Sequence, residues 1–461
     1  MRYNDLALKM MLIGSCILLI ESFQWPQMAS SQDMKRTLDL QESVKIALTN
    51  NPAIKNATQR ILEAKAKVNK ARAGFLPQLL FNSSYTRLNE EPTIIIPAGS
   101  LGKIASEEYI PLSSSLIPVE DKENFNINFT LQQSLFSGGR IKFTCKQAKS
   151  ELEVIEGKYE VVKQGVIIKV KTAYYEVLKA MKFEIVTEES TKLLQAHKKR
   201  VENLYKIGSV SQNDLLRTEV QLANAKVDLL KAKNAVVMAK VHFYNILGLD
   251  LKTDIDIELI EEIPTKFDPE EPIVLNDCLN SALKNRAEVR IMEANLWSAD
   301  SEVQLANAAN RPNVTFSSHY GWEGKDFFPD QENWSVQVKS SLSLFDSFAT
   351  KARIVQAESG LERIKNDQKQ VVNDICIEVR ESYLNLLEAE EEVNMMKITV
   401  SQAEENFRIL EGKYQEGMAT NIEVLDAQLL LSNSRLSYYQ SLFDYELAMA
   451  KLDKAMGNLR L

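Results

Sequence analysis

Residue types that mark catalytic or disulfide-bonded proteins are rare in this sequence of 461 residues, which has four cysteines and three histidines. The cysteines have unrelated spacings, so neither a disulfide framework nor a metal motif is predicted. His197, His242 and His319 have no ligand or catalytic base at motif spacing, and no GxxxxGK[ST] phosphate loop occurs. We therefore predict no enzyme, no cofactor and no metal site, and we expect each histidine to be exposed or satisfied.

Proline is missing from two long stretches of the chain. None of the 12 prolines lies within residues 119–263 or after Pro329. Because proline inside a helix costs about 3 kcal/mol, these stretches favour very long helices.

Long hydrophobic runs and a basic excess are also absent. The 55 Lys and Arg residues against 63 Asp and Glu residues give a net charge of −8, so a nucleic-acid partner is not expected. The apolar run Met10–Ile20 is too short to span a bilayer, and small residues follow near Ala29, so residues 1–31 are predicted to be a signal peptide. A membrane anchor, or lipid attachment at Cys16, remains an alternative.

The chain contains an internal duplication. An offset of 417 − 208 = 209 places Gly208 on Gly417, and an offset of 285 − 50 = 235 places Asn50 on Asn285. The difference, 235 − 209 = 26 residues, is extra length before the second strand of the first half. The predicted parts are a first structural repeat at 38–248, an equatorial or linker segment at 249–274 and a second structural repeat at 275–457.

Each repeat shows the same order of elements. A helical segment comes first, at about 40–73 and 275–309. Two strands with alternating apolar and polar residues follow, and then two long helices. The predicted strands are about 79–87, 125–136, 313–322 and 334–345, and the predicted long helices are about 139–206, 213–247, 347–415 and 421–456.

The strands are compatible with two kinds of sheet. Their alternation over about ten residues fits a half-buried sheet on a soluble core and also a transmembrane barrel. Four strands cannot close a barrel, so several chains would have to share one. The shorter long helices have apolar residues at coiled-coil spacing: Leu216, Val220, Ala223, Val227, Leu230, Val237 and Val241 in one, and Ile422, Leu425, Leu429, Leu436 and Phe443 in the other.

Short turns join the two long helices of each repeat. Gly208 and Gly417 fit the left-handed residue that ends a helix. The sequences Ser211-x-x-Asp214 and Thr420-x-x-Glu423 are capping boxes, which already account for Asp214 and Glu423.

Asp426 is not needed for capping. It lies one turn beyond Glu423 on the same helix face. A ring of such carboxylates from several chains would form a constriction that attracts cations.

Three motifs and the duplicated hairpins resemble one family. The motifs are Leu38-Asp39-Leu40-Gln41-Glu42-Ser43-Val44 with Asn50-Asn51-Pro52, Leu135-Phe136-Ser137-Gly138-Gly139-Arg140, and Glu423-Val424-Leu425-Asp426-Ala427-Gln428. Over about residues 38–457 the sequence resembles the TolC family of outer-membrane efflux proteins.

This resemblance implies a mainly α fold with a transmembrane β part. Four strands per chain would contribute to a 12-stranded β-barrel of a homotrimer, in contact with outer-membrane lipid. The long hairpins would continue it as an α-barrel tunnel through the periplasm. The implied function is passive conduction in a tripartite efflux or type I secretion system, with a periplasmic membrane-fusion (adaptor) protein and an inner-membrane transporter as partners.

The resemblance also implies roles for particular residues. Glu423 and Asp426 match the acidic pair of the periplasmic gate, and Tyr414 and Asp214 match two residues of the latch that closes it. The basic latch position is occupied by Ala419. The positions expected to contact the adaptor are Gly208, Ser209, Gly417 and Met418.

One alternative from another functional class remains open. The same long helices and strands also fit a periplasmic coiled-coil scaffold with a small soluble β-sheet. A scaffold would be released from cells without detergent, whereas a duct would stay with the outer membrane.

Overall fold

The computed structural model describes residues 37–91, 93–96, 115–118, 121–250, 256–257 and 273–459. The predicted signal peptide and most of the segment 249–274 lie outside the described residues. The chain divides into two units. In the smaller unit, β1 (Thr37–Leu38) pairs in parallel with β6 (Asp256–Ile257). The larger unit contains all other described elements.

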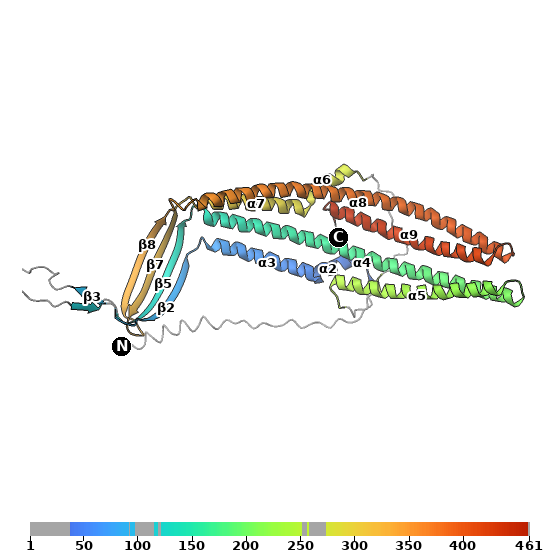
Figure 1. Ribbon diagram of the computed structural model, residues 1–461, viewed down its shortest axis with the longest axis horizontal. Helices are drawn as coiled ribbons and strands as arrows, with labels where there is room; N and C mark the ends of the chain where they lie inside the picture. Colours follow the sequence, from blue (N-terminus) through green and yellow to red (C-terminus); the bar gives the residue numbers. More distant parts are fainter. Residues whose placement is uncertain are drawn as a thin grey trace, which may run out of the picture. The chain divides into compact units, whose positions relative to one another are not determined.

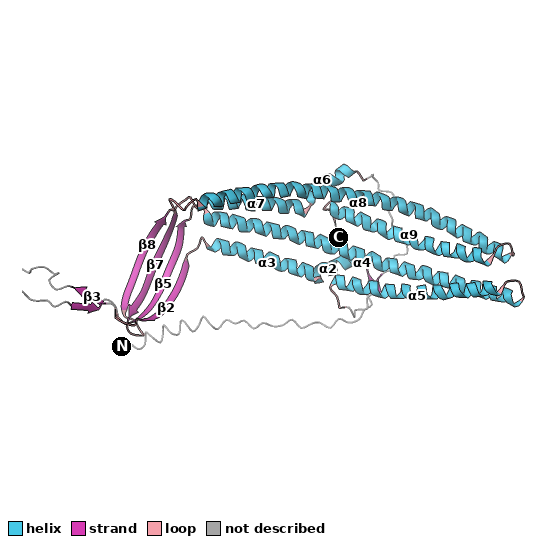
Figure 2. Cartoon of the chain, in the orientation of Figure 1, coloured by secondary structure: helices cyan, strands magenta, loops and turns pink. Residues whose placement is uncertain are grey.

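Helices dominate the larger unit (Figures 1 and 2). The long helices α4 and α8 have 67 residues each, which corresponds to about 100 Å at 1.5 Å per residue. Helix α5 packs on α4, and α9 packs on α8, as two antiparallel hairpins. The helices are α2 (Leu40–Asn50), α3 (Pro52–Ala73), α4 (Arg140–Lys206), α5 (Gln212–Leu247), α6 (Leu275–Asn285), α7 (Ala287–Ala308), α8 (Ala349–Gln415) and α9 (Asn421–Ala455).

Each of the helical segments expected at about 40–73 and 275–309 consists of two helices separated by one extended residue. Asn51 is extended (φ −60°, ψ 128°), since a residue before proline avoids the helical region, and its side chain caps α3. Arg286 is also extended (φ −66°, ψ 135°). Its buried guanidinium forms ion pairs with Glu288 and with Glu378 of α8.

Both breaks lie beside a glycine that follows a long hairpin. Gly248 and Gly457 each have a φ of +71°. A Cβ on Gly248 would lie 2.8 Å from the carbonyl oxygen of Asn50, and one on Gly457 would lie 3.0 Å from the carbonyl carbon of Asn285. The left-handed backbone and the close approach therefore both require glycine in the two halves.

Four antiparallel strands form the main sheet, in the order β2 (Gln78–Arg87), β5 (Glu123–Phe136), β7 (Asn313–Gly324) and β8 (Gln331–Ser341). A separate pair, β3 (Thr93–Ile96) and β4 (Ser115–Pro118), belongs to the long loop between β2 and β5.

The register of the main sheet separates apolar from polar residues. One row across the four strands consists of Phe81, Phe129, Tyr320 and Trp334. The next row, on the opposite face, consists of Asn82, Asn128, Gly321 and Asn333. The sheet therefore has one apolar and one polar face, as the alternation predicted.

The edge strand β8 differs in extent from the predicted strand at 334–345. It begins at Gln331 and ends at Ser341, which pairs with Asn313, the first residue of β7. The residue before Asn313 is Pro312, which cannot donate a backbone hydrogen bond. No described strand therefore pairs with residues 342–345.

The apolar stripe predicted on α5 does not pack within its own hairpin. Five of its seven residues, Leu216, Val220, Val227, Leu230 and Val237, are more than half exposed. The buried positions in the tip half of α5 are Thr218 and Leu222 instead.

The other hairpin also leaves apolar side chains uncovered. On α9, Val424, Ala427 and Leu431 are buried, whereas Ile422 and Leu429 are exposed. On α8 the exposed large apolar residues are Val355, Ile377, Leu384, Leu387, Met395, Ile398 and Ile409. Since α4 and α9 pack against each other, these exposed residues of α8 and α5 lie on the outer helices of the paired hairpins.

Among the residues that the structure describes, none of the helices combines the length and the apolar character that a membrane span requires.

Candidate functional site at the hairpin tips

The two hairpins end in short turns with the same backbone geometry. Gly208 and Gly417 have φ angles of +78° and +74°. The N–H groups of Gly208 and Ser209 donate to the carbonyls of Tyr205 and Leu204, as in a Schellman motif, and the second turn repeats this pattern. The four residues predicted to contact an adaptor, Gly208, Ser209, Gly417 and Met418, are all exposed.

Both predicted capping boxes are present. The hydroxyl and N–H of Ser211 donate to the Asp214 carboxylate at 2.6 and 3.1 Å. The N–H and hydroxyl of Thr420 donate to the Glu423 carboxylate at 2.7 and 2.8 Å. These two bonds from Thr420 hold the pKa of Glu423 below its usual value.

Asp426 differs from Glu423 in its surroundings. Both carboxylates are exposed on α9, but no hydrogen bond or ion pair joins Asp426 to any residue that the structure describes. Its charge therefore faces solvent without a partner. The gate role of this pair remains a prediction.

The two predicted latch residues lie close together without bonding. Tyr414 is buried, and its hydroxyl has no hydrogen-bond partner within the described part of the chain. Burial raises the pKa of Tyr414, and the nearby charge of Asp214 raises it further. The Asp214 carboxylate, however, accepts from Ser211. The latch role of this pair also remains a prediction. Ala419 packs beside the apolar cluster that includes Tyr414 and Val424.

A buried polar network joins the two hairpins just behind the tips. His197 of α4, Thr218 of α5 and Asn421 of α9 are only 6%, 0% and 3% exposed. His197 Nε2 lies 2.8 Å from Asn421 Oδ1. The Asn421 amide nitrogen donates to the Asp214 carbonyl at 3.1 Å and to the Thr218 hydroxyl at 3.2 Å.

The sequence predicted an exposed or satisfied histidine at position 197 but not its contact with Asn421. The signal for a buried His197 is its spacing, because Leu194, His197 and Val201 follow a 3-4 pattern and all three are buried. A histidine in such a series occupies a packing position of the coiled coil.

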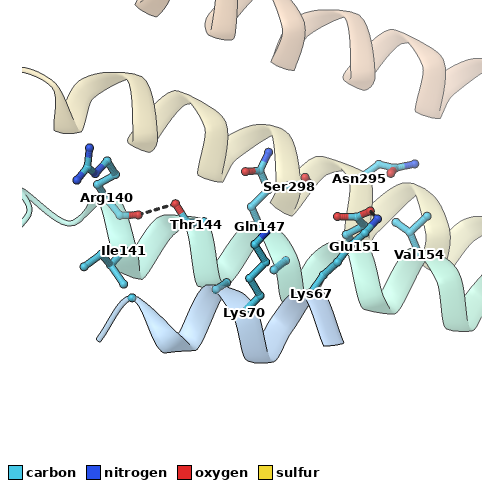
Figure 3. A pocket seen from close by; sticks show the side chains of 13 residues that line it. Lys67, Lys70, Arg140, Ile141, Thr144, Gln147, Glu151, Val154, Asn295 and Ser298 are labelled. Carbon is cyan, nitrogen blue, oxygen red and sulfur yellow. Dashed lines mark hydrogen bonds and ion pairs between the residues drawn. The ribbon is translucent and has the colours of Figure 1, made fainter. Parts of the chain in front are cut away.

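A groove of about 540 Å³ lies between α3, α4 and α7, far along α4 from the tips (Figure 3). Lys67, Lys70 and Arg140 contribute positive charge to its lining, and Lys67 forms an ion pair with Glu151 at 3.0 Å. None of the predicted site residues lines it.

Comparison with known proteins identifies the family. The sequence matches the family described as outer membrane efflux protein over residues 44–249 and 278–458. It is 25% identical to Protein CyaE of Bordetella pertussis over 331 residues, which cover 71% of this chain and 64% of that protein. It is 20% identical to Outer membrane protein TolC of Escherichia coli over 432 residues, which cover 90% of this chain and 81% of that protein.

A solved structure shares the fold. The CmeC outer membrane channel of Campylobacter jejuni matches with a TM-score of 0.76 and 16% identity, covering 95% of this chain and 91% of that chain. The chain belongs to the outer membrane efflux protein family. It is therefore an efflux channel protein of the outer membrane with a periplasmic extension, and the alternative of a periplasmic scaffold is set aside.

Proposed function

We propose that three copies of this chain form the outer-membrane channel-tunnel of a tripartite efflux or type I secretion system. The tunnel passively conducts substrates delivered by an inner-membrane transporter through a periplasmic adaptor. The observation that carries this proposal is the sheet, which has an apolar face and two uncovered edges.

The edges of the sheet favour a shared barrel. All residues of β2 and β8 are exposed, and the outer side of each strand has no pairing partner among the described strands. Unpaired strand edges are a liability that barrel closure removes. Four strands from each of three copies give twelve, which is within the range of natural membrane barrels.

The exposed helix stripes favour the same assembly. Lys198 of α4 pairs with Glu219 of α5 at 3.0 Å, and Arg200 of α4 pairs with Glu411 of α8 at 3.2 Å. Residues can be counted along the helices from these two contacts. By this count, the exposed Leu230 of α5 and the exposed residue 398 of α8 lie at the same height along the hairpins. In a ring of copies, the exposed apolar residues of α5 in one copy would therefore contact those of α8 in the next copy.

Engineered cysteines test this ring. In a background without native cysteines, we expect Leu230→Cys with Ile398→Cys to form disulfides between copies and to give covalent trimers upon oxidation in membranes. The matched control is Leu230→Cys with Ile377→Cys, since Ile377 is also exposed but lies about 32 Å further along α8. Monomers from the first pair, or equal cross-linking in both pairs, would refute the ring.

The acidic pair at the tips supports a gate. In a trimer, Glu423 and Asp426 would supply six carboxylates around the entrance, which would attract cations. We expect Glu423→Gln with Asp426→Asn to lower the preference for cations in single-channel recordings. Unchanged selectivity in open channels would remove this role. We further propose that the exposed turns at Gly208 and Gly417 contact the adaptor.

A further inference from the structure

The contact between His197 and Asn421 joins elements that must separate if the two tips move apart. His197 belongs to the α4–α5 hairpin, and Asn421 is the first residue of α9 in the other hairpin. The ring of His197 lies 5.2 Å from the ring of Tyr414, which belongs to an apolar cluster with Val201 and Val424. Buried polar groups in such surroundings are costly unless they are hydrogen-bonded. The contact therefore favours one arrangement of the tips.

Hydrogen-bond chemistry fixes the roles in this contact. The Asp214 carbonyl can only accept, so the Asn421 amide must turn its NH₂ group toward it. The Asn421 oxygen then faces His197, whose Nε2 must be the protonated nitrogen. Moving α9 away would break the bonds to His197, to Asp214 and to Thr218 together.

The charged and titratable groups near His197 come from three helices. Arg200 lies on α4 itself, Asp214 lies on α5, and Glu411 and Tyr414 lie on α8. From α9 the facing group is the uncharged Asn421. Arg200 and Glu411 pair with each other at 3.2 Å, so their charges largely offset at the imidazole.

Burial is the largest influence on the imidazole, and it lowers the pKa of His197, while the bond to Asn421 opposes this effect. If the tips separate, the ring meets water and its pKa returns toward the ordinary value. A proton is then bound more readily by the separated tips than by the packed ones. The stability of the packed arrangement is therefore complete above the ordinary histidine pKa and declines as the pH falls below it.

We propose that His197 is a positioning residue that, through Asn421, holds the tip of the α8–α9 hairpin against the α4–α5 hairpin, and that acidification releases it. The contact between His197 and Asn421 would hold the entrance closed, a role for which Ala419 offers no basic side chain. The inference rests on the proposed function, because it assigns a regulation to the same entrance.

Single-channel recordings at pH 7.5 and 5.5 test the device. In the wild type we expect about a tenfold rise in the open-to-closed ratio at pH 5.5, which corresponds to about 1.4 kcal/mol. His197→Gln can still donate to Asn421 but does not titrate in this range, so its ratio should stay low at both pH values. His197→Phe cannot donate, and its ratio should be high at both. The matched control His242→Gln, at an exposed histidine of α5, should behave as the wild type.

A second measurement does not depend on conduction. Spin labels at the exposed tip positions Ile207 and Met418 report the separation of the two turns. We expect this distance to increase at pH 5.5 in the wild type but not in His197→Gln. The same pH response in both proteins would overturn the proton-dependent release, and a wild-type distance in His197→Phe would overturn the positioning role. An absence of channels from every protein would instead contradict the proposed function.

Discussion

Replacement of Leu230 by alanine is expected to weaken the trimer without destabilising the single chain. Leu230 is 61% exposed in one chain, whereas Leu222, two turns away on the same helix, is 8% exposed. Complete burial of a leucine contributes about 1.5–3 kcal/mol, so covering the exposed share of Leu230 contributes about 1–2 kcal/mol at each interface. A ring with three such interfaces would lose about 3–6 kcal/mol upon Leu230→Ala.

Two readouts distinguish the variants. Leu230→Ala should lower the temperature at which the detergent-solubilised trimer dissociates, as followed by gel electrophoresis, with an unchanged helical circular-dichroism spectrum of the chain. Leu222→Ala should lower the unfolding temperature of the chain itself, because truncation of a buried leucine costs about 2–5 kcal/mol. A Leu230→Ala trimer that dissociates at the wild-type temperature would refute the assignment of the α5 stripe to the interface.

Three further outcomes are expected. Val336→Lys on the apolar face should reduce the outer-membrane fraction on immunoblots, because lysine on a lipid-facing strand costs about 2–4 kcal/mol, whereas Gln337→Lys on the polar face should not. Gly417→Ala should lower the melting temperature through about 1–2 kcal/mol of left-handed backbone strain, whereas alanine at the helical Gly412, where a Cβ meets nothing within 4 Å, should not. The capping bonds of Glu423 should stabilise α9 above the ordinary glutamate pKa and be lost as the pH falls through its lowered pKa, so Glu423→Gln should flatten the acid limb of a pH–stability curve.

The faces of the sheet were predictable because strand alternation is a local property. Phe81 and Trp334 lie on the same face because each follows the alternation within its own strand. The end of β8 was not predictable from its own residues, since pairing stops where β7 begins at Asn313. The break at Asn51 has a visible cause in the following proline. The break at Arg286 is not followed by a proline, and one of the two ion pairs of Arg286 there is with the distant Glu378.

The same distinction applies to the hairpins. Capping residues such as Asp214 and Glu423 were found from three-residue spacing. The 3-4 pattern identified apolar stripes but did not reveal which stripe faces the partner helix, because Leu222 and Leu230 look alike in the sequence. The bond between His197 and Asn421 joins residues 224 positions apart, so no local pattern could predict it.

The most direct test of a channel made of three copies is a planar-bilayer recording of purified protein whose mass has been determined. We expect discrete current steps from particles of three copies, and no steps from particles of one copy. Steps from single copies, or monodisperse trimers that never conduct, would contradict the proposed channel.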